Sequence, residues 1–186
     1  GIHLKYKVNP DICMFGKALG NGYAITSIIG KRKIMSKASD SFISSTFWSE
    51  RIGYVAGCKT LEVMEKNKSW EYVTKLGREI KKSWIALGQK YELPIEIYGI
   101  DALPSFSIKS KNFLKYKTFI SQEMLKNNFL CSNAVYVCTA HNNKILQNYL
   151  KKIDKIFSII KECEDGRNIN NLLKGPVCRS QFKRLN

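Results

Sequence analysis

The sequence has no long apolar run and is poor in histidine, proline and acidic residues. Its longest apolar segment, residues 23–29, is far shorter than the roughly 18 residues that a membrane-spanning helix needs. The two histidines and six cysteines form no Cys-x-x-Cys pair and show no zinc-ligand spacing. The sequence therefore predicts neither a membrane span nor a metal site.

The cysteines are widely spaced, and no basic-then-apolar leader stands at the start of the sequence. Cys131 and Cys138 lie in apolar segments, where a thiol behaves as a small hydrophobe. We therefore expect reduced thiols, no disulfides and a cytoplasmic location.

Basic residues outnumber acidic ones by 31 to 15, which gives a net charge of +16. Such an excess can indicate nucleic-acid binding, because Lys and Arg neutralise phosphates. Here the positive charges are mostly lysines spread along the predicted helices, and the longest basic run is residues 31–33. We expect no nucleic-acid partner, and a basic, non-catalytic nucleic-acid-binding module remains an alternative.

Apolar residues make up 44% of the 186-residue chain, enough for a real hydrophobic core. Residues 1–49 are rich in glycine and serine and predict strands and turns, with a strand at 23–29. A helical pattern runs from Glu50 to about Asn67, and a second begins at Ser69 and ends before Pro94.

Beyond Pro94, strands alternate with helices, which predicts an α/β or α+β fold. The expected strands are 95–98, 103–108 and 135–139, and the expected helices are 112–127 and 142–163.

One segment, residues 10–23, sets a single lysine among glycines and apolar side chains: Pro-Asp-Ile-Cys-Met-Phe-Gly-Lys-Ala-Leu-Gly-Asn-Gly-Tyr. Desolvation disfavours a charged ammonium, so Lys17 held there would carry a neutral amine able to form a Schiff base. The glycines would let the backbone approach a bulky ligand closely. From the residues alone, a surface lysine in a glycine-rich hairpin is the favoured interpretation.

Residues 10–22 resemble the lysine signature of class III, fold type I pyridoxal-phosphate aminotransferases, which ends in Gly-Lys-x-Leu-Gly-x-Gly. Further segments resemble the glutamate-1-semialdehyde aminomutase-like branch of this family. They are Ile29-Gly30 with Ile34-Met35, Ser44 to Glu50, Leu103 to Phe106, Val135 to His141, and Gly175 to Leu185. Because these matches keep one order along nearly the whole chain, the resemblance outweighs the surface-lysine interpretation.

The resemblance implies a role for each matched residue. Lys17 would form the Schiff base with pyridoxal 5'-phosphate and then move a proton between the substrate carbon and the cofactor's C4′ atom. Thr46 would bind the cofactor phosphate of the neighbouring subunit of a homodimer, and Ser45 is a weaker candidate for the same role. The substrates would be a small-molecule amino donor and a carbonyl acceptor. His141 has a structural role in this interpretation.

The resemblance also implies an organisation in which the chain is the C-terminal part of an α/β enzyme. Residues 1–49 would end the large cofactor domain, 50–68 would form a connecting helix, and 69–186 would form a small α+β domain. The family's carboxylate for the pyridine nitrogen, its phosphate loop and its ring-stacking aromatic would lie upstream.

Two activities within the family are open at this stage. One is amino-group transfer between two molecules, and the other is an aminomutase reaction within one molecule. The segments Asn21 to Tyr23 and Ser45 to Glu50 depart from the aminomutase pattern and favour an aminotransferase, with amino sugars or amino acids as candidate substrates.

Overall fold

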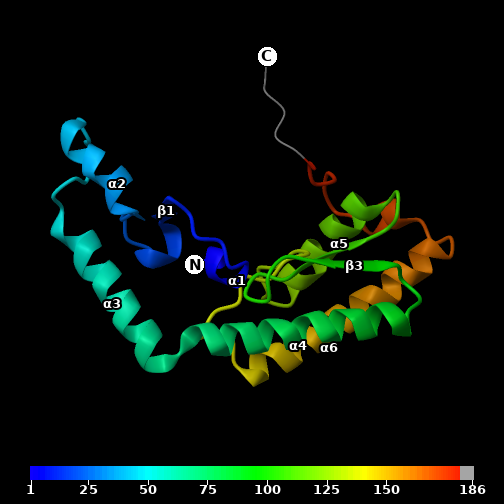
Figure 1. Ribbon diagram of the computed structural model, residues 1–186. Helices are drawn as coiled ribbons and strands as arrows, with labels where there is room; N and C mark the ends of the chain where they lie inside the picture. The colour runs from blue at the N-terminus through cyan, green and yellow to red at the C-terminus, as the bar shows by residue number, and fades with distance from the viewer. Residues whose placement is uncertain (181–186) are drawn as a thin grey trace, which may run out of the picture. The chain divides into compact units, whose positions relative to one another are not determined.

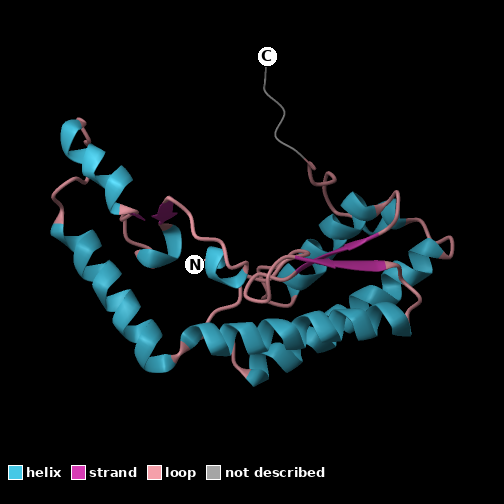
Figure 2. Cartoon of the chain, in the orientation of Figure 1, coloured by secondary structure: helices cyan, strands magenta, loops and turns pink. Residues whose placement is uncertain are grey.

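The computed structural model describes residues 1–180 and divides into two compact units. Unit 1 is Gly1–Ser69, and unit 2 begins at Trp70 (Figure 1). Helices predominate, and the described strands form two short antiparallel pairs (Figure 2). The predicted match at 182–185 lies outside the described residues. Within residues 1–180, no helix combines the length and apolarity that a bilayer crossing requires.

Unit 1 is built around one β-hairpin and one long helix. Its elements are α1 (Ile2–Lys5), β1 (Ile12–Phe15), η1 (Lys17–Leu19), β2 (Ser27–Gly30), α2 (Arg32–Met35), η2 (Ser36–Asp40) and α3 (Arg51–Asn67). Strands β1 and β2 pair antiparallel, with Ile12 opposite Gly30 and Phe15 opposite Ser27. The predicted strand at 23–29 is wrong in its first half, because residues 20–23 form a turn in which the Tyr23 N–H donates to the Gly20 carbonyl.

Unit 1 buries hardly any apolar surface among its described residues. Its buried positions are three glycines, Gly20, Gly53 and Gly57. Helix α3 forms as the sequence predicts, yet Ile52 and Val55 on it are 54% and 58% exposed. The apolar side chains of this unit therefore contribute little stability through burial within residues 1–69.

Unit 2 contains the hydrophobic core. Its elements are α4 (Ser69–Lys90), β3 (Ile95–Tyr98), β4 (Ser105–Ile108), α5 (Phe113–Lys126), α6 (Asn143–Glu164) and η3 (Ile169–Leu172). These bounds confirm the helices and the first two strands predicted after Ser69 to within a few residues. Asn142 caps α6, because its side chain accepts a hydrogen bond from the Ile145 N–H at 3.0 Å.

Three aromatic rings link the sheet of unit 2 to its two longest helices. The ring of Phe106 on β4 lies 4.8 Å from that of Trp84 on α4 and 5.5 Å from that of Phe157 on α6. The indole N–H of Trp84 donates to the Tyr149 hydroxyl at 2.9 Å, and burial raises the pKa of Tyr149. Helices α4 and α6 therefore lie side by side (Figure 1) and share one core.

The predicted strand at 135–139 is an irregular extended segment in the structure. Just before it, Ala134 forms an isolated bridge with Ser105 of β4, beside which the Val135 N–H donates to the Pro104 carbonyl at 3.0 Å. Proline has no N–H to return this bond, so a regular ladder cannot continue at that point. Val137 donates one further bond, to the carbonyl of Ala102.

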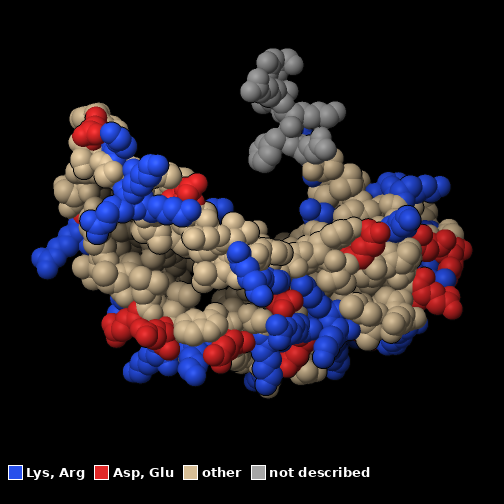
Figure 3. Space-filling view, viewed as in Figure 1, with Lys and Arg blue, Asp and Glu red and all other residues tan. Residues whose placement is uncertain are grey.

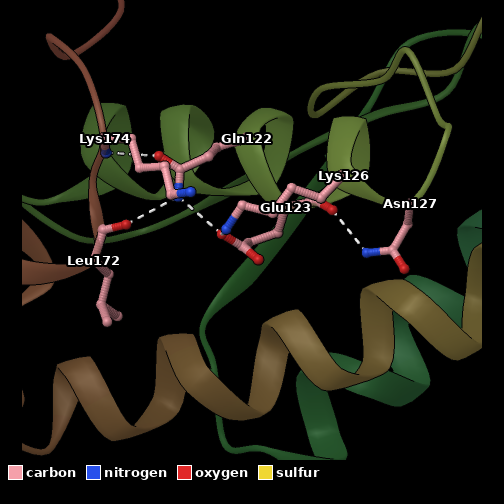
Figure 4. Close-up of polar contacts among 6 residues, drawn as sticks. All are labelled: Gln122, Glu123, Lys126, Asn127, Leu172 and Lys174. Atoms are coloured by element: carbon pink, nitrogen blue, oxygen red, sulfur yellow. Dashed lines mark hydrogen bonds and ion pairs between the residues drawn. The ribbon is translucent and has the colours of Figure 1, made fainter.

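A glutamine on α5 holds the segment that follows η3 (Figure 4). The Gln122 side-chain amide donates to the Leu172 carbonyl at 2.9 Å, and its oxygen accepts from the Lys174 N–H at 2.7 Å. Four residues further on, the Cys178 N–H donates to the Thr118 hydroxyl at 2.9 Å. These three hydrogen bonds hold residues 172–178 against α5, although this segment forms no strand.

Helix α4 carries a glycine against which a loop carbonyl packs. A Cβ placed on Gly77 would lie 1.6 Å from the backbone carbonyl oxygen of Asp101. The Asp101 carboxylate in turn accepts hydrogen bonds from Lys81 at 3.0 Å and Arg78 at 2.8 Å. Hydrogen bonds from Lys81 and then Arg78 hold the pKa of Asp101 below its ordinary value. The 99–103 turn is thereby fixed to α4.

We expect Gly77→Ala to lower the free energy of unfolding by about 1–3 kcal/mol, because the new methyl group collides with backbone. Gly88→Ala on the same helix is the control, since its Cβ would meet side-chain atoms of Ile95, from 2.9 Å at Cδ1 to 3.2 Å at Cβ, and not backbone at 1.6 Å. Both changes gain the same helix propensity. Urea unfolding followed by tryptophan fluorescence measures the difference, and equal stability of the two variants would contradict this packing argument.

Candidate active site

The lysine singled out in the sequence lies in the loop that joins the two strands of unit 1. Lys17 is the first residue of η1, directly after β1. Its carbonyl accepts hydrogen bonds from the N–H groups of Gly20 and Asn21, both at 3.2 Å. The backbone of Lys17 has φ of 48°, a left-handed conformation that is uncommon for a residue with a side chain. The loop therefore keeps Lys17 in a sparsely populated backbone state.

At the open end of the hairpin, opposite the Lys17 loop, the two strands are joined by contacts between Asp11 and Lys31. The Lys31 N–H donates to the Asp11 carbonyl at 3.0 Å, and the Lys31 ammonium pairs with the Asp11 carboxylate at 2.7 Å. Both side chains are exposed, so the ion pair itself contributes little stability. The backbone bond extends the β1–β2 pairing and fixes where the chain enters and leaves the hairpin.

Helix α3 supports the loop from one side through two glycines, which sequence reasoning missed. A Cβ on Gly53 would lie 2.5 Å from the Ala24 carbonyl oxygen, so the loop backbone rests directly on the helix there. Gly57, one turn later on the same face, faces the side chains of Leu19 and Ile25 at 3.8 to 3.9 Å. The Gly-x-x-x-Gly spacing in the sequence was the signal that could have revealed this contact.

The Lys17 side chain itself is exposed. This agrees with the surface position that the residues alone favour, and the described residues do not desolvate the amine. Lys17 forms no ion pair within residues 1–180. Its amine is thus sterically open to a ligand.

Ser45 and Thr46 lie in the turn that precedes α3, separate from the Lys17 loop. The Trp48 N–H donates to the Ser45 carbonyl at 3.2 Å, and the Tyr54 hydroxyl donates to the Trp48 carbonyl at 2.9 Å. Both Ser45 and Thr46 are exposed, and their hydroxyls make no hydrogen bond to other described residues. The structure does not bring them into contact with Lys17.

His141 of unit 2 has a structural setting, as the sequence interpretation expects. Its Nδ1 accepts from the Cys138 N–H at 3.3 Å, and its carbonyl accepts from the Tyr72 hydroxyl at 2.6 Å. Among the described side chains, no group of three His, Cys, Asp or Glu residues is arranged to hold a metal ion.

Charged side chains are mixed on the face of the molecule drawn in Figure 3, where blue and red groups alternate along α3 and α4. Several are paired, including Lys59 with Glu62 at 2.7 Å and Lys90 with Asp154 at 2.7 Å. On this face the basic excess does not form one continuous patch.

Comparison with known proteins identifies the family to which the chain belongs. Residues 2–158 match the aminotransferase class-III family, and the chain belongs to that family. Membership of the family implies a pyridoxal-phosphate cofactor.

Two curated relatives and one solved structure illustrate the range of similar proteins. The 3-aminobutyryl-CoA aminotransferase of Cloacimonas acidaminovorans is 27% identical over 87% of this chain and 41% of its own length. The glutamate-1-semialdehyde 2,1-aminomutase of Hyperthermus butylicus is 26% identical over 84% of this chain and 41% of its own. The FumI protein of Sphingopyxis sp. MTA144, solved in its PLP internal aldimine form, aligns with a TM-score of 0.78 at 19% identity, over 92% of this chain and 42% of that structure.

These matches confirm the predicted fold class, since the chain shares part of the transaminase fold. The chain spans about two fifths of the length of the curated relatives that it matches. Both aminotransferase and aminomutase names occur among them, so the comparison leaves the two activities open.

The residues present fit the cofactor chemically. Pyridoxal phosphate carries an aldehyde and a phosphate, and unit 1 offers an exposed primary amine at Lys17 and exposed hydroxyls at Ser45 and Thr46. An amine without an ion-pair partner can condense with an aldehyde, and hydroxyls can donate hydrogen bonds to phosphate oxygens.

Proposed function

We propose that this chain is the C-terminal part of a pyridoxal-phosphate-dependent aminotransferase that moves an amino group between a small amine and a carbonyl compound. The observation that carries the proposal is the place of Lys17 in the Gly-Lys-x-Leu-Gly segment, left-handed between β1 and the turn at Gly20, with an exposed amine that pairs with no described carboxylate. Strained backbone of this kind is often found where function requires it. The family match spans this loop.

In this proposal Lys17 has two tasks. It binds the cofactor through its amine, and after the substrate takes its place it accepts and returns a proton at the substrate carbon and at the cofactor's C4′ atom. The bound cofactor supplies the electron-withdrawing ring for this chemistry. Because the described residues leave the amine exposed, exclusion of water around Lys17 requires the cofactor and polypeptide beyond residues 1–180.

Thr46 and, less strongly, Ser45 are proposed to hold the cofactor phosphate. Their location on a different loop from Lys17, with hydroxyls that bond to no described residue, is consistent with serving the site of a second subunit. The proposal therefore includes a homodimer, in which each site is built from two chains related by a two-fold axis. The proposal also includes the predicted domain organisation. Residues 1–49 would end the cofactor domain, residues 50–68 would form the connecting helix, and residues 69–186 would form the small domain.

An aminomutase of the same family is the second candidate. It is favoured by the similarity to the Hyperthermus butylicus protein, which carries that name. Detection of an isomer of the substrate, formed without a second carbonyl compound, would distinguish the mutase from the transferase.

We expect Lys17→Ala in the holoenzyme to abolish covalent cofactor binding and nearly all turnover, because no other described amine occupies this loop. Borohydride reduction followed by peptide mapping checks the attachment site. Lys59→Ala is the matched control, since Lys59 is also exposed but pairs with Glu62 on α3. Cofactor found on any lysine other than Lys17 would overturn the assignment.

Mixed dimers test the role of Thr46. We expect a dimer of one Lys17→Ala subunit and one Thr46→Ala subunit to recover activity, because one of its two sites then has both an intact lysine and an intact threonine. Activity is compared with that of each parent homodimer after mixing is verified by mass. A verified mixed dimer without recovery would count against a shared site.

The 186-residue chain by itself is expected to bind pyridoxal phosphate weakly and to lack turnover. Unit 1 buries only glycines within the described residues, so the Lys17 loop lacks a packed layer behind it. Titration with pyridoxal phosphate and a half-reaction assay with a panel of amines measure both properties. Tight, stoichiometric binding with turnover would show that the chain needs no further polypeptide.

A further inference from the structure

We propose that Gly53 on α3 is a positioning residue for Lys17. In this view, the absence of a side chain at Gly53 lets the loop rest on the helix backbone, and this contact keeps Lys17 in its left-handed conformation. The inference rests on the proposed function of Lys17, and it assigns a task to a residue outside the lysine signature.

The Lys17 loop contains more strained backbone than its own bonds support. Lys17 and Asn21 both have φ of 48°, and Gly22 has φ of 107°. Glycine tolerates a positive φ, but Lys17 and Asn21, two left-handed residues with side chains within five positions, relax unless their surroundings hold them. The loop's internal support is a set of turn bonds of 3.1 to 3.2 Å, in a segment where Lys17 and Asn21 are exposed.

The support that remains comes from α3. Gly20 is buried, and a Cβ there would lie 2.1 Å from the Tyr23 carbonyl oxygen, so the turn is as tight as a glycine permits. The next residue, Ala24, places its carbonyl oxygen 2.5 Å from a Cβ built on Gly53. The Gly53 contact therefore fixes the returning arm of the loop.

The contact at Gly53 differs in kind from the one at Gly57. At Gly53 the neighbouring atom is a backbone oxygen, which no side-chain rotation can move away. At Gly57 the nearest atoms are Leu19 and Ile25 side-chain carbons at 3.8 to 3.9 Å, which leaves room for a methyl group. An alanine at Gly53 would have to move the Ala24 carbonyl from 2.5 Å to at least 3.4 Å, the start of ordinary contact.

This displacement, about 0.9 Å, acts on the loop that carries Lys17. A misplacement of roughly 1 Å at a reacting group can reduce turnover by about 100-fold. Alanine raises helix propensity at both glycine positions. A difference in turnover between Gly53→Ala and Gly57→Ala therefore measures the effect of the contact with the loop and not a change in helix stability.

The experiment compares wild type, Gly53→Ala, Gly57→Ala and Lys17→Ala in the holoenzyme, with two readouts. The first is turnover together with the fraction of cofactor fixed on Lys17 by borohydride. The second, on the cofactor-free protein, is amide hydrogen exchange at residues 19–21. We expect Gly53→Ala to lose about 10- to 100-fold in kcat, with little change in KM, and to lose amide protection. Gly57→Ala is expected to stay within about twofold of wild type.

A second variant covers the case in which Gly53→Ala does not fold. Gly20→Ala disturbs the same turn, where its Cβ would meet the Tyr23 carbonyl oxygen at 2.1 Å and the Ile25 Cγ2 at 2.8 Å, and it should reproduce both the exchange and the turnover defects. Wild-type protection and Lys17 labelling in a folded Gly53→Ala protein would overturn the positioning role. If wild-type protein fixes no cofactor on Lys17, the proposed function fails instead, and the exchange data still decide whether Gly53 holds the loop.

Discussion

Direct packing of a loop carbonyl on a helical glycine is the constraint on which both units depend. In unit 1, the Ala24 carbonyl occupies the space that a side chain at Gly53 would fill, and in unit 2 the Asp101 carbonyl does the same at Gly77. In each contact the loop backbone touches the helix backbone, so even a methyl group added at the glycine would not fit. In unit 2 this fixes the turn before β4, and in unit 1 it fixes the loop of Lys17.

The two units differ in what surrounds that contact. In unit 2, the Gly77 contact is reinforced by ion pairs to Asp101 and by a core centred on Trp84, Phe106 and Phe157. In unit 1, the Gly53 contact is accompanied by the packing of Leu19 and Ile25 on Gly57, while most apolar side chains of α3 and the strands are exposed. The stability of unit 2 is therefore set by its own core. Within the described residues, the Lys17 loop is held by these contacts with α3.

Much of unit 2 could be predicted from periodicity. The stripe that includes Leu76, Ile80 and Trp84 recurs at helical spacing and is buried in the structure. The 135–139 strand could not be predicted correctly, because its apolar alternation is genuine but its partner strand offers Pro104 where an N–H is needed. In unit 1, the same periodicity predicted α3 correctly, but apolar side chains of its pattern such as Ile52 and Val55 are exposed, since a pattern cannot reveal whether a covering layer is present.

The candidate site was predictable only in part. The Gly-Lys segment and the Ser-Thr turn came from resemblance, whereas physical reasoning alone favoured a surface lysine, and the exposed Lys17 shows why. What the resemblance could not supply was the support from Gly53, for which the only sequence signal is its Gly-x-x-x-Gly spacing with Gly57. The role of Gly53 depends on its contact with the Ala24 carbonyl, which lies about thirty residues earlier in the sequence.

A lysine suited to this chemistry must differ from the chain's many other lysines, and in the described residues neither exposure nor a positive φ supplies that difference alone, since Lys7 and Lys68 share both. Lys59 and Lys90 are exposed as well, but both are neutralised by carboxylates, and both lie in regular helices. Lys17 pairs with no described carboxylate, and its left-handed backbone begins the short turn η1 in a loop that packs on α3. A left-handed residue held by tight turns presents its amine in a restricted direction before any ligand arrives. In the proposed enzyme, desolvation would be completed by the cofactor and by polypeptide beyond the described residues. Selectivity for Lys17 thus begins with the geometry of a short loop on two glycines, and reactivity follows from assembly of the site around it.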